Sequence, residues 1–191
     1  MTAMQPHLTE AVRKHFATYW RGHEQEDFVW TLGPIAERLP GFRVRRIAPS
    51  GPEDPWIYAT LGASSAPGPG HTEFILLSPS ENPRHVETLT MVAGLHADPQ
   101  YRLSVGSTID IGRPWFEGAV ADHLLVSLPY PFGPELEHCH NSEHRIRVLW
   151  LVPITAAEAA YARSTQLEKF EELLESSGVD VLSPSRPSIV T

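Results

Sequence analysis

Two apolar runs in the C-terminal half form the strongest hydrophobic pattern of the chain. They cover Leu124–Leu128 and Ile146–Ile154, are rich in Leu, Val and Ile, and each ends at a proline. Short apolar runs that turn residues bound are typical of buried strands rather than helices. Directly after the second run, Thr155 and Glu158 have the spacing of a capping box, in which hydroxyl and carboxylate bond the free backbone donors of a helix start. We therefore expect two core strands, the second leading into a helix.

Weaker periodicities predict the other elements. Leu8, Val12 and Phe16 recur at helical spacing and indicate an N-terminal helix over 9–21, with Thr9 as its cap. Strands are expected at Phe42–Ile47, Trp56–Leu61 and Glu73–Leu77, which would form an antiparallel meander, and at Ser107–Ile111. Shorter or later helices are expected within Trp30–Leu39, from near Pro83 to just before Asp98, and around Leu167–Leu174 with Gly178 as a left-handed cap. Ala63–Gly70 has too little side chain to pack and reads as a flexible loop.

This order of elements predicts an α+β protein with a mixed, mostly antiparallel β-sheet flanked by helices. The length of 191 residues fits one domain, and a hydrophobic fraction of 41% with 20% charged residues is typical of a globular protein. Eighteen prolines argue against a helical bundle. The net charge of −8 disfavours binding to nucleic acid, which depends on clustered Lys and Arg.

The sequence also bears on where the protein acts. Cys139 is the single cysteine, so no internal disulfide can form and nothing indicates an oxidising compartment. The N-terminal residues lack the apolar stretch of a secretory signal, and no apolar run approaches the ~20 residues that a membrane span needs. We therefore expect a cytoplasmic protein without a membrane partner.

Four metal-ligating side chains gather near residue 140. His138, Cys139, His140 and His144 carry the imidazole and thiolate donors that zinc prefers. However, the segment reads as an exposed polar loop, and no second ligand pair is evident elsewhere. We therefore expect no metal and no cofactor, and a metal- or thiol-dependent enzyme that uses this cluster stays an alternative.

Other acid–base candidates are weaker. Asp122 and His123 are adjacent, and neighbours on a strand point to opposite faces, so a role in stabilising the start of the strand is favoured over joint catalysis. Asp110 precedes a Gly-containing turn and is expected to anchor it through side-chain bonds to the backbone. The nucleophile-elbow and phosphate-binding glycine motifs do not occur, so we expect no enzyme.

The Tyr130–Gly133 loop differs from these clusters because it places two aromatic side chains between prolines. A rigid aromatic surface suits protein recognition, since little entropy is lost on binding. The alternative, slightly favoured because large apolar side chains are usually buried, is that Tyr130 and Phe132 fold back over the end of the sheet.

Several ordered phrases carry a resemblance to a known family: TIDIGRPW, DHLLVSLPYPFGP and RIRVLWLVPITAAE, with weaker likeness in GPIAERLPGFRVRRIAP and LEKFEELLESSGVDVLSPSRPSIV. Together they cover roughly residues 33–190, and they resemble the bacterial stand-alone members of the suppressor of fused (SUFU-like) domain family. The resemblance implies a single SUFU-like α/β sandwich over 1–191, with the helix at 9–21, a core over 33–178 and an extended tail over 179–191.

The same resemblance implies a non-enzymatic protein-binding module. Stand-alone bacterial members are often assigned as immunity proteins that bind and neutralise a toxin domain, so the expected partner is another protein. The candidate contact residues are Asp110, Trp115, Asp122, His123, Tyr130 and Phe132. The oligomeric state stays open, and a structural subunit that forms a homodimer through a sheet edge is a further alternative.

Overall fold

The structure is a computed structural model that describes residues 6–141 and 143–191. These residues fall into two compact units, one that runs through Leu103 and includes Leu128–Trp150, the other made of Ser104–Ser127 and the residues from Leu151 onward. The boundary lies inside strand β8 (Arg145–Ile154). Among the described residues, the strand order is β1-β2-β3-β4-β8-β6-β5, with β7 pairing β8 beside this path.

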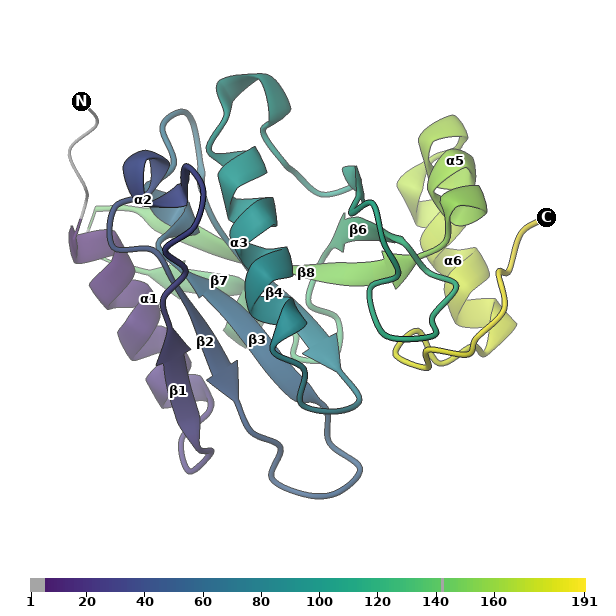
Figure 1. The fold of residues 1–191 in the computed structure, drawn as a ribbon, viewed down its shortest axis with the longest axis horizontal. Coiled ribbons are helices and arrows are strands. Elements are labelled where there is room, and N and C mark those ends of the chain that lie inside the picture. Colours follow the sequence, from purple (N-terminus) through teal and green to yellow (C-terminus); the bar gives the residue numbers. More distant parts are fainter. Residues whose placement is uncertain (1–5, 142) are drawn as a thin grey trace. The chain divides into compact units, whose positions relative to one another are not determined.

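The first unit holds most of the sheet (Figure 1). Its strands are β1 Gln25–Phe28, β2 Arg43–Ile47, β3 Trp56–Leu61, β4 His71–Ser78, β7 His138–His140 and the first part of β8. Neighbouring strands from β1 to β4 are antiparallel, β4 and β8 are parallel, and β7 is antiparallel to β8. Its helices are α1 Pro6–Tyr19, α2 Ile35–Arg38, α3 Arg84–His96 and α4 Pro134–Glu137, with single 3₁₀ turns at Ala63–Ser65 and Pro99–Tyr101.

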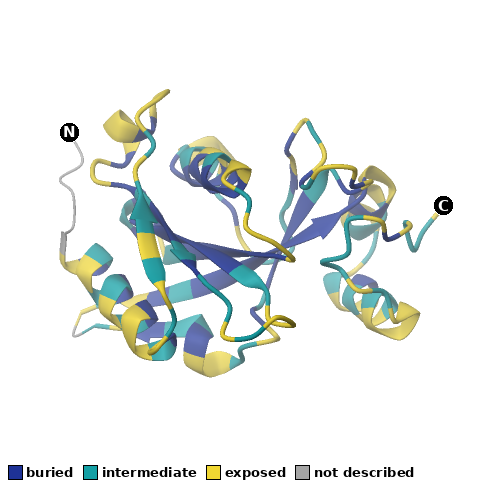
Figure 2. Ribbon diagram, turned by 60° about the horizontal axis from the view of Figure 1, so that its bottom comes forward, coloured by how far each residue is buried: buried dark blue, intermediate teal, exposed yellow. Residues whose placement is uncertain are grey.

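Helices α1 and α3 cover opposite faces of this sheet, as Figure 2 shows. The apolar stripe of α1 is completely buried at Leu8, Val12 and Phe16. On the other face, His96 of α3 lies edge-on to Phe74 of β4, with ring centroids 5.1 Å apart. A sheet that is covered on both faces needs nearly continuous apolar strands, which explains the uninterrupted runs in β3, β4 and β8.

The second unit contains β5 Thr108–Asp110, β6 His123–Ser127, the end of β8 and helices α5 Ala156–Ser164 and α6 Leu167–Ser177. Strands β5 and β6 are antiparallel. The predicted capping box is present: the Thr155 hydroxyl accepts a bond from the Glu158 N–H, and the Glu158 carboxylate accepts one from the Thr155 N–H. Helix α6 buries Phe170 completely and ends at Gly178, which has the positive φ of 66° that favours glycine there.

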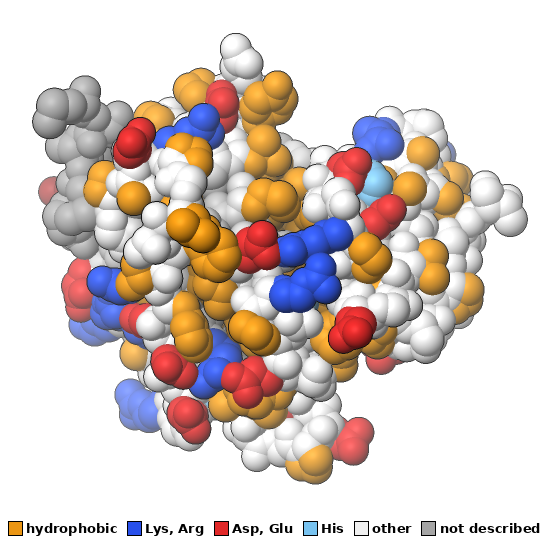
Figure 3. All heavy atoms as spheres, viewed as in Figure 1, with side chains coloured by type: hydrophobic (Ala, Val, Ile, Leu, Met, Phe, Trp, Pro, Cys, Tyr) orange, Lys and Arg blue, Asp and Glu red, His pale blue; other side chains and the backbone are white. Residues whose placement is uncertain are grey.

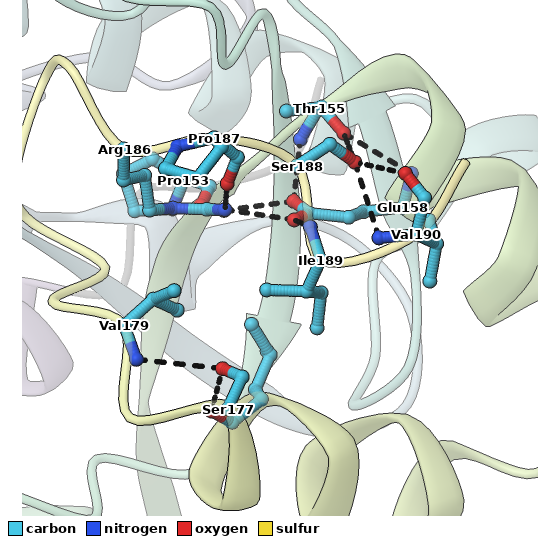
Figure 4. A network of polar contacts seen from close by, with 11 residues as sticks. Pro153, Thr155, Glu158, Ser177, Val179, Arg186, Pro187, Ser188, Ile189 and Val190 are labelled. Atoms are coloured by element: carbon cyan, nitrogen blue, oxygen red, sulfur yellow. Dashed lines mark hydrogen bonds and ion pairs between the residues drawn. The ribbon is translucent and has the colours of Figure 1, made fainter.

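A buried ion pair fixes the C-terminal segment to the second unit (Figure 4). Arg186, only 5% exposed, donates to both carboxylate oxygens of Glu158 at 2.7 Å and to the Pro153 carbonyl at 2.9 Å. The Ile189 N–H donates to the same carboxylate at 3.0 Å. Burial acts to raise the pKa of Glu158, but the hydrogen bonds from Arg186, Ile189 and Thr155 outweigh it and the pKa is lowered. Residues 179–191 contain neither helix nor strand, and Arg186 ties this segment into the interior of the second unit.

The predicted α+β class with a mixed, mostly antiparallel sheet is confirmed. Some details of the prediction were wrong. Helix α1 begins at Pro6 rather than at Thr9, and β1 was missed. The Ala63–Gly70 segment is not a loose loop, because Ala63, Ser64 and Ala66 are buried. Within the described part of the chain, no helix combines the length and the apolar character that a membrane crossing requires.

Candidate functional site

An exposed apolar groove lies in the first unit beside α2 and α3. The segment between β1 and α2 leaves two large aliphatic side chains in solvent, Val29 at 54% and Leu32 at 70% exposure, and Met91 of α3 is 39% exposed. A monomer tolerates scattered exposed apolar residues, but a contiguous group is typical of an interaction surface. Figure 3 shows hydrophobic side chains gathered where α2 and α3 lie next to each other.

The surface is hollowed at this place. A groove of about 440 Å³ is bounded by apolar residues and two opposite charges: Trp30, Leu32, Pro34, Ile35, Arg38, Glu87, Thr90, Met91, Gly94 and Leu95. A second hollow of about 150 Å³ adjoins it, and Trp30 and Ile35 line both. Of these two shared residues, Ile35 is buried and Trp30 is half-buried. A concave apolar surface with a large aromatic side chain has the composition of a protein-binding hot spot.

Local sequence explains why these side chains stay outside. Helix α2 is only four residues long, and Pro34 precedes it without a side-chain cap. Val29 and Leu32 lie in the segment between β1 and α2, which has neither helical nor strand structure and leaves both side chains exposed. We predicted one helix broken by Pro34 within Trp30–Leu39, and that prediction did not reveal which side chains would be exposed.

Four of the six predicted contact residues lie in the second unit. Asp110 of β5 is directly opposite His123 of β6, and its carboxylate accepts a bond from the Gly112 N–H at 2.7 Å, which confirms its predicted role in the turn. The Asp122 carboxylate lies 2.7 Å from Nδ1 of His123. We expected the side chains of Asp122 and His123 to point to opposite faces of a strand, and this was wrong. Strand β6 begins at His123, so Asp122 lies before it and its side chain need not alternate with that of His123. The pair stabilises the start of β6.

Trp115 is unsuited to contact a partner. The residue is 3% exposed, and its backbone N–H donates to the Ala121 carbonyl at 2.9 Å, which closes the loop between β5 and β6. The indole belongs to the core of the second unit. Including Trp115 among the expected contact residues was therefore wrong. An aromatic residue next to a proline in a loop gives no sign in the sequence of which way it points.

In the aromatic loop, which belongs to the first unit, one of the two aromatic side chains folds back and the other is exposed. Phe132 folds back onto α1, where its ring is edge-on to Trp20 at 5.9 Å and its carbonyl accepts a bond from the Tyr19 hydroxyl at 3.0 Å. Tyr130 is 60% exposed. The Phe132 side chain therefore packs against the N-terminal helix, whereas most of the Tyr130 side chain is exposed to solvent.

The His138–His144 cluster does not converge on one point. His138–His140 is strand β7 rather than a loop, so its side chains alternate, and Cys139 is 1% exposed. Burial, and then the charge of Glu73, raise the pKa of the Cys139 thiol to about 11. A thiol that stays protonated at neutral pH is neither a good nucleophile nor a good metal ligand. The buried, protonated Cys139 thiol therefore does not favour the alternative of a thiol-dependent enzyme.

His144 belongs to a different group. Donor atoms of His7, Glu143 and His144 all lie within 4.8 Å of one another. The sequence did not link His7 to the other two, because 136 positions separate His7 from Glu143.

Sequence reasoning also missed the buried carboxylate of Glu73 on β4. Its oxygens accept bonds from the N–H groups of Gly62, Ala63 and Ser64, at 2.9–3.1 Å, and from the hydroxyls of Thr60 and Ser64. Complete burial raises the pKa of Glu73, and these hydrogen bonds oppose the rise. The arrangement holds the 3₁₀ turn against the sheet, and an acidic residue inside an apolar strand was its only sign in the sequence.

Comparison with known proteins supplies the family. A family model described as suppressor of fused protein (SUFU) matches residues 37–187. The chain belongs to the SUFU family. The crystal structure of a protein from Neisseria gonorrhoeae FA 1090, described as a SUFU homologue, matches at 36% identity with a TM-score of 0.86, covering 97% of this chain and 98% of that one. No curated protein matches the chain significantly.

More distant SUFU structures share the fold. The Sufu chain in a Sufu–Fu complex matches at 13% identity and a TM-score of 0.71, over 95% of this chain and 92% of that one. Drosophila Suppressor of Fused matches at 14% identity and a TM-score of 0.72, over 98% of this chain and 54% of that one. The first of these proteins was solved bound to another protein, Fu. The SUFU match over 37–187 includes α3 and the last two residues of α2, whereas Trp30, Leu32 and Ile35 of the groove precede the matched residues.

Proposed function

We propose that this SUFU-family chain is a non-enzymatic protein-binding module and that its partner docks on the groove between α2 and α3. The observation that carries the proposal is the exposure of Leu32 and Met91 around a hollow of about 440 Å³, with the exposed Val29 lining the adjoining hollow of about 150 Å³. Burying apolar surface of this kind gains roughly 25 cal/mol per Å² before the costs of association. A distant family member in complex with a protein supports the same kind of function.

The charge of the chain favours a particular partner. With a net charge of −8, the protein attracts a basic partner and accelerates its approach. The groove itself carries Arg38 and Glu87 at its border, so a partner that inserts apolar side chains can be oriented by one acidic and one basic group. We propose a basic toxin domain as the partner, which this chain neutralises as an immunity protein. The likeness to bacterial stand-alone SUFU-like proteins supports this finer assignment.

Capture from the lysate of the source cell, with mass spectrometry, provides the partner for the test. The captured protein is then produced separately and titrated with wild-type chain and with Leu32→Asp. We expect one partner per chain and a loss of affinity of at least tenfold in Leu32→Asp, because the substitution removes apolar contact area and forces a carboxylate to lose its hydration on docking. Leu32 is 70% exposed, so the substitution leaves the fold intact.

Val120→Asp is the matched control, since Val120 is 59% exposed and lies in the second unit. It should bind as the wild type does. Tyr130→Ala tests the aromatic loop as the contact surface instead. Equal affinity of Leu32→Asp and wild type, with a loss in Tyr130→Ala, would move the site from the groove to that loop. A captured toxin domain that the wild-type chain fails to inhibit would refute the immunity assignment and leave the binding module intact.

A further inference from the structure

We propose that His7, Glu143 and His144 bind one zinc ion and that His71 supplies a fourth ligand. This site is independent of the groove and of the proposed partner. Its residues come from three places in the first unit: the first turn of α1, the start of β4, and the turn between β7 and β8. Two or three imidazoles with one carboxylate form a ligand set that zinc accepts readily.

The donor atoms are already close. Those of His7, Glu143 and His144 lie within 4.8 Å of one another, and Nε2 of His144 is 3.9 Å from a Glu143 carboxylate oxygen. Tetrahedral zinc with bonds of about 2.0–2.2 Å separates its ligand atoms by roughly 3.4 Å. These three donors therefore need to approach by little more than an ångström, which side-chain rotation provides, and His71 lies outside this group and has to rotate towards it. The rings of His7 and His144 are nearly parallel, at 24°, with centroids 5.7 Å apart.

The turn before β8 holds two of the ligands in place. The side-chain oxygen of Asn141 accepts bonds from the N–H groups of Glu143, at 2.9 Å, and His144, at 2.6 Å. These bonds fix the backbone from which both donors project. Ordering of the backbone in advance lowers the entropy that metal binding would otherwise cost.

His71 is the independent indication of a ligand site. Its ring centroid is 4.8 Å from that of His144, and its Nδ1 lies 2.8 Å from the Ser64 carbonyl oxygen. A carbonyl only accepts hydrogen bonds, so Nδ1 carries the proton and Nε2 is left as the nitrogen that can coordinate a metal. Metal-ligating histidines commonly have this arrangement, in which the second ring nitrogen donates to a backbone carbonyl.

A metal here would join elements that are distant in the sequence. His7 lies in the first turn of α1, His71 starts β4 and His144 precedes β8. Binding of zinc to the folded state alone stabilises the protein by mass action. The expected consequence is a metal-dependent attachment of the start of α1 to the N-terminal ends of the parallel strands β4 and β8.

The test uses zinc chloride and tag-free protein that has been treated with chelator. Isothermal titration should show one ion per chain, and the thermal unfolding midpoint should rise with zinc but not with magnesium, which prefers oxygen ligands. The His144→Ala variant should lose at least tenfold in affinity and the entire zinc-dependent shift. Cobalt in place of zinc should give the intense visible absorption of a four-coordinate site, and this absorption should be lost in His7→Ala.

His140→Ala is the matched control, since His140 is an exposed histidine of the same hairpin and lies outside the ligand group. It should keep the affinity and the shift. Absence of zinc binding, or equal loss in His140→Ala and His144→Ala, would overturn the proposal. The unfolding midpoint of each variant without metal shows whether it is folded, so a loss of binding is not confused with a loss of structure.

Discussion

At the residue scale, three buried ionisable side chains of the first unit show how hydrogen bonds and protonation state reduce the free-energy cost of burial. Glu73 is surrounded by donors, and Cys139 stays a thiol because its pKa is about 11. His96 is 1% exposed, and its Nδ1 accepts a bond from the Leu103 N–H at 3.2 Å. Burial, helped by the charge of Arg102, lowers the pKa of His96 to about 4. The imidazole is therefore neutral at physiological pH.

The neutral state of His96 makes stability depend on pH. In the unfolded chain a histidine has its ordinary pKa near 6.5. Below about pH 6.5 the unfolded state therefore binds a proton at His96, whereas the folded state does not until the pH is much lower. The stabilisation is complete above about pH 6.5 and declines as the pH falls towards about 4. Between pH 7.5 and 5 we expect a loss of roughly 2 kcal/mol in the free energy of unfolding from this group.

Urea unfolding at the two pH values measures this loss in the wild type and in His96→Asn. Asparagine does not titrate, and its oxygen can accept the Leu103 N–H, so its loss should be smaller by about 2 kcal/mol. The raised pKa of Glu73 acts with the opposite sign, but both proteins share it and the comparison removes it. An identical pH dependence of the two proteins would show that His96 is not the group responsible.

At the element scale, the sequence predicted elements whose apolar pattern is local and missed those that depend on distant partners. Strand β3 and the capping box of α5 were anticipated because their residues alone decide them. Strand β1 reads Gln-Glu-Asp-Phe and has no apolar alternation. It forms because Asp27 accepts bonds from Arg45 of β2, at 2.6 and 3.0 Å, and such a cross-strand pair is not visible in the β1 sequence.

The C-terminal segment depends on one side chain in the same way. Arg186→Ala should lower the free energy of unfolding by about 3–5 kcal/mol, because it leaves the Glu158 carboxylate buried without a cation. Arg163→Ala is the control, since Arg163 is exposed and its bond to Thr108 should contribute less than about 1 kcal/mol. Chemical denaturation measures both variants. If Arg186→Ala were no less stable than Arg163→Ala, the buried ion pair would not be what fixes residues 179–191.

At the scale of the whole molecule, the family could be recognised from the sequence but the interaction surface could not. The ordered phrases from Gly33 onward agree with the SUFU match over 37–187. The groove depends on which apolar side chains stay outside the core, and the hydrophobic pattern of the sequence does not distinguish an exposed leucine such as Leu32 from a buried one. For the same reason Trp115 was predicted as a contact residue, although it is buried. That the chain is a single domain stays a prediction.

The proposed docking of a partner on the groove is the central claim, and amide hydrogen exchange of the complex tests it most directly. Compared with the free chain, the complex should exchange more slowly over residues 29–35 and over α3, while residues 110–123 and the Tyr130 loop stay unchanged. Slower exchange at the Tyr130 loop, with residues 29–35 unaffected, would contradict the account and place the partner on the aromatic loop instead.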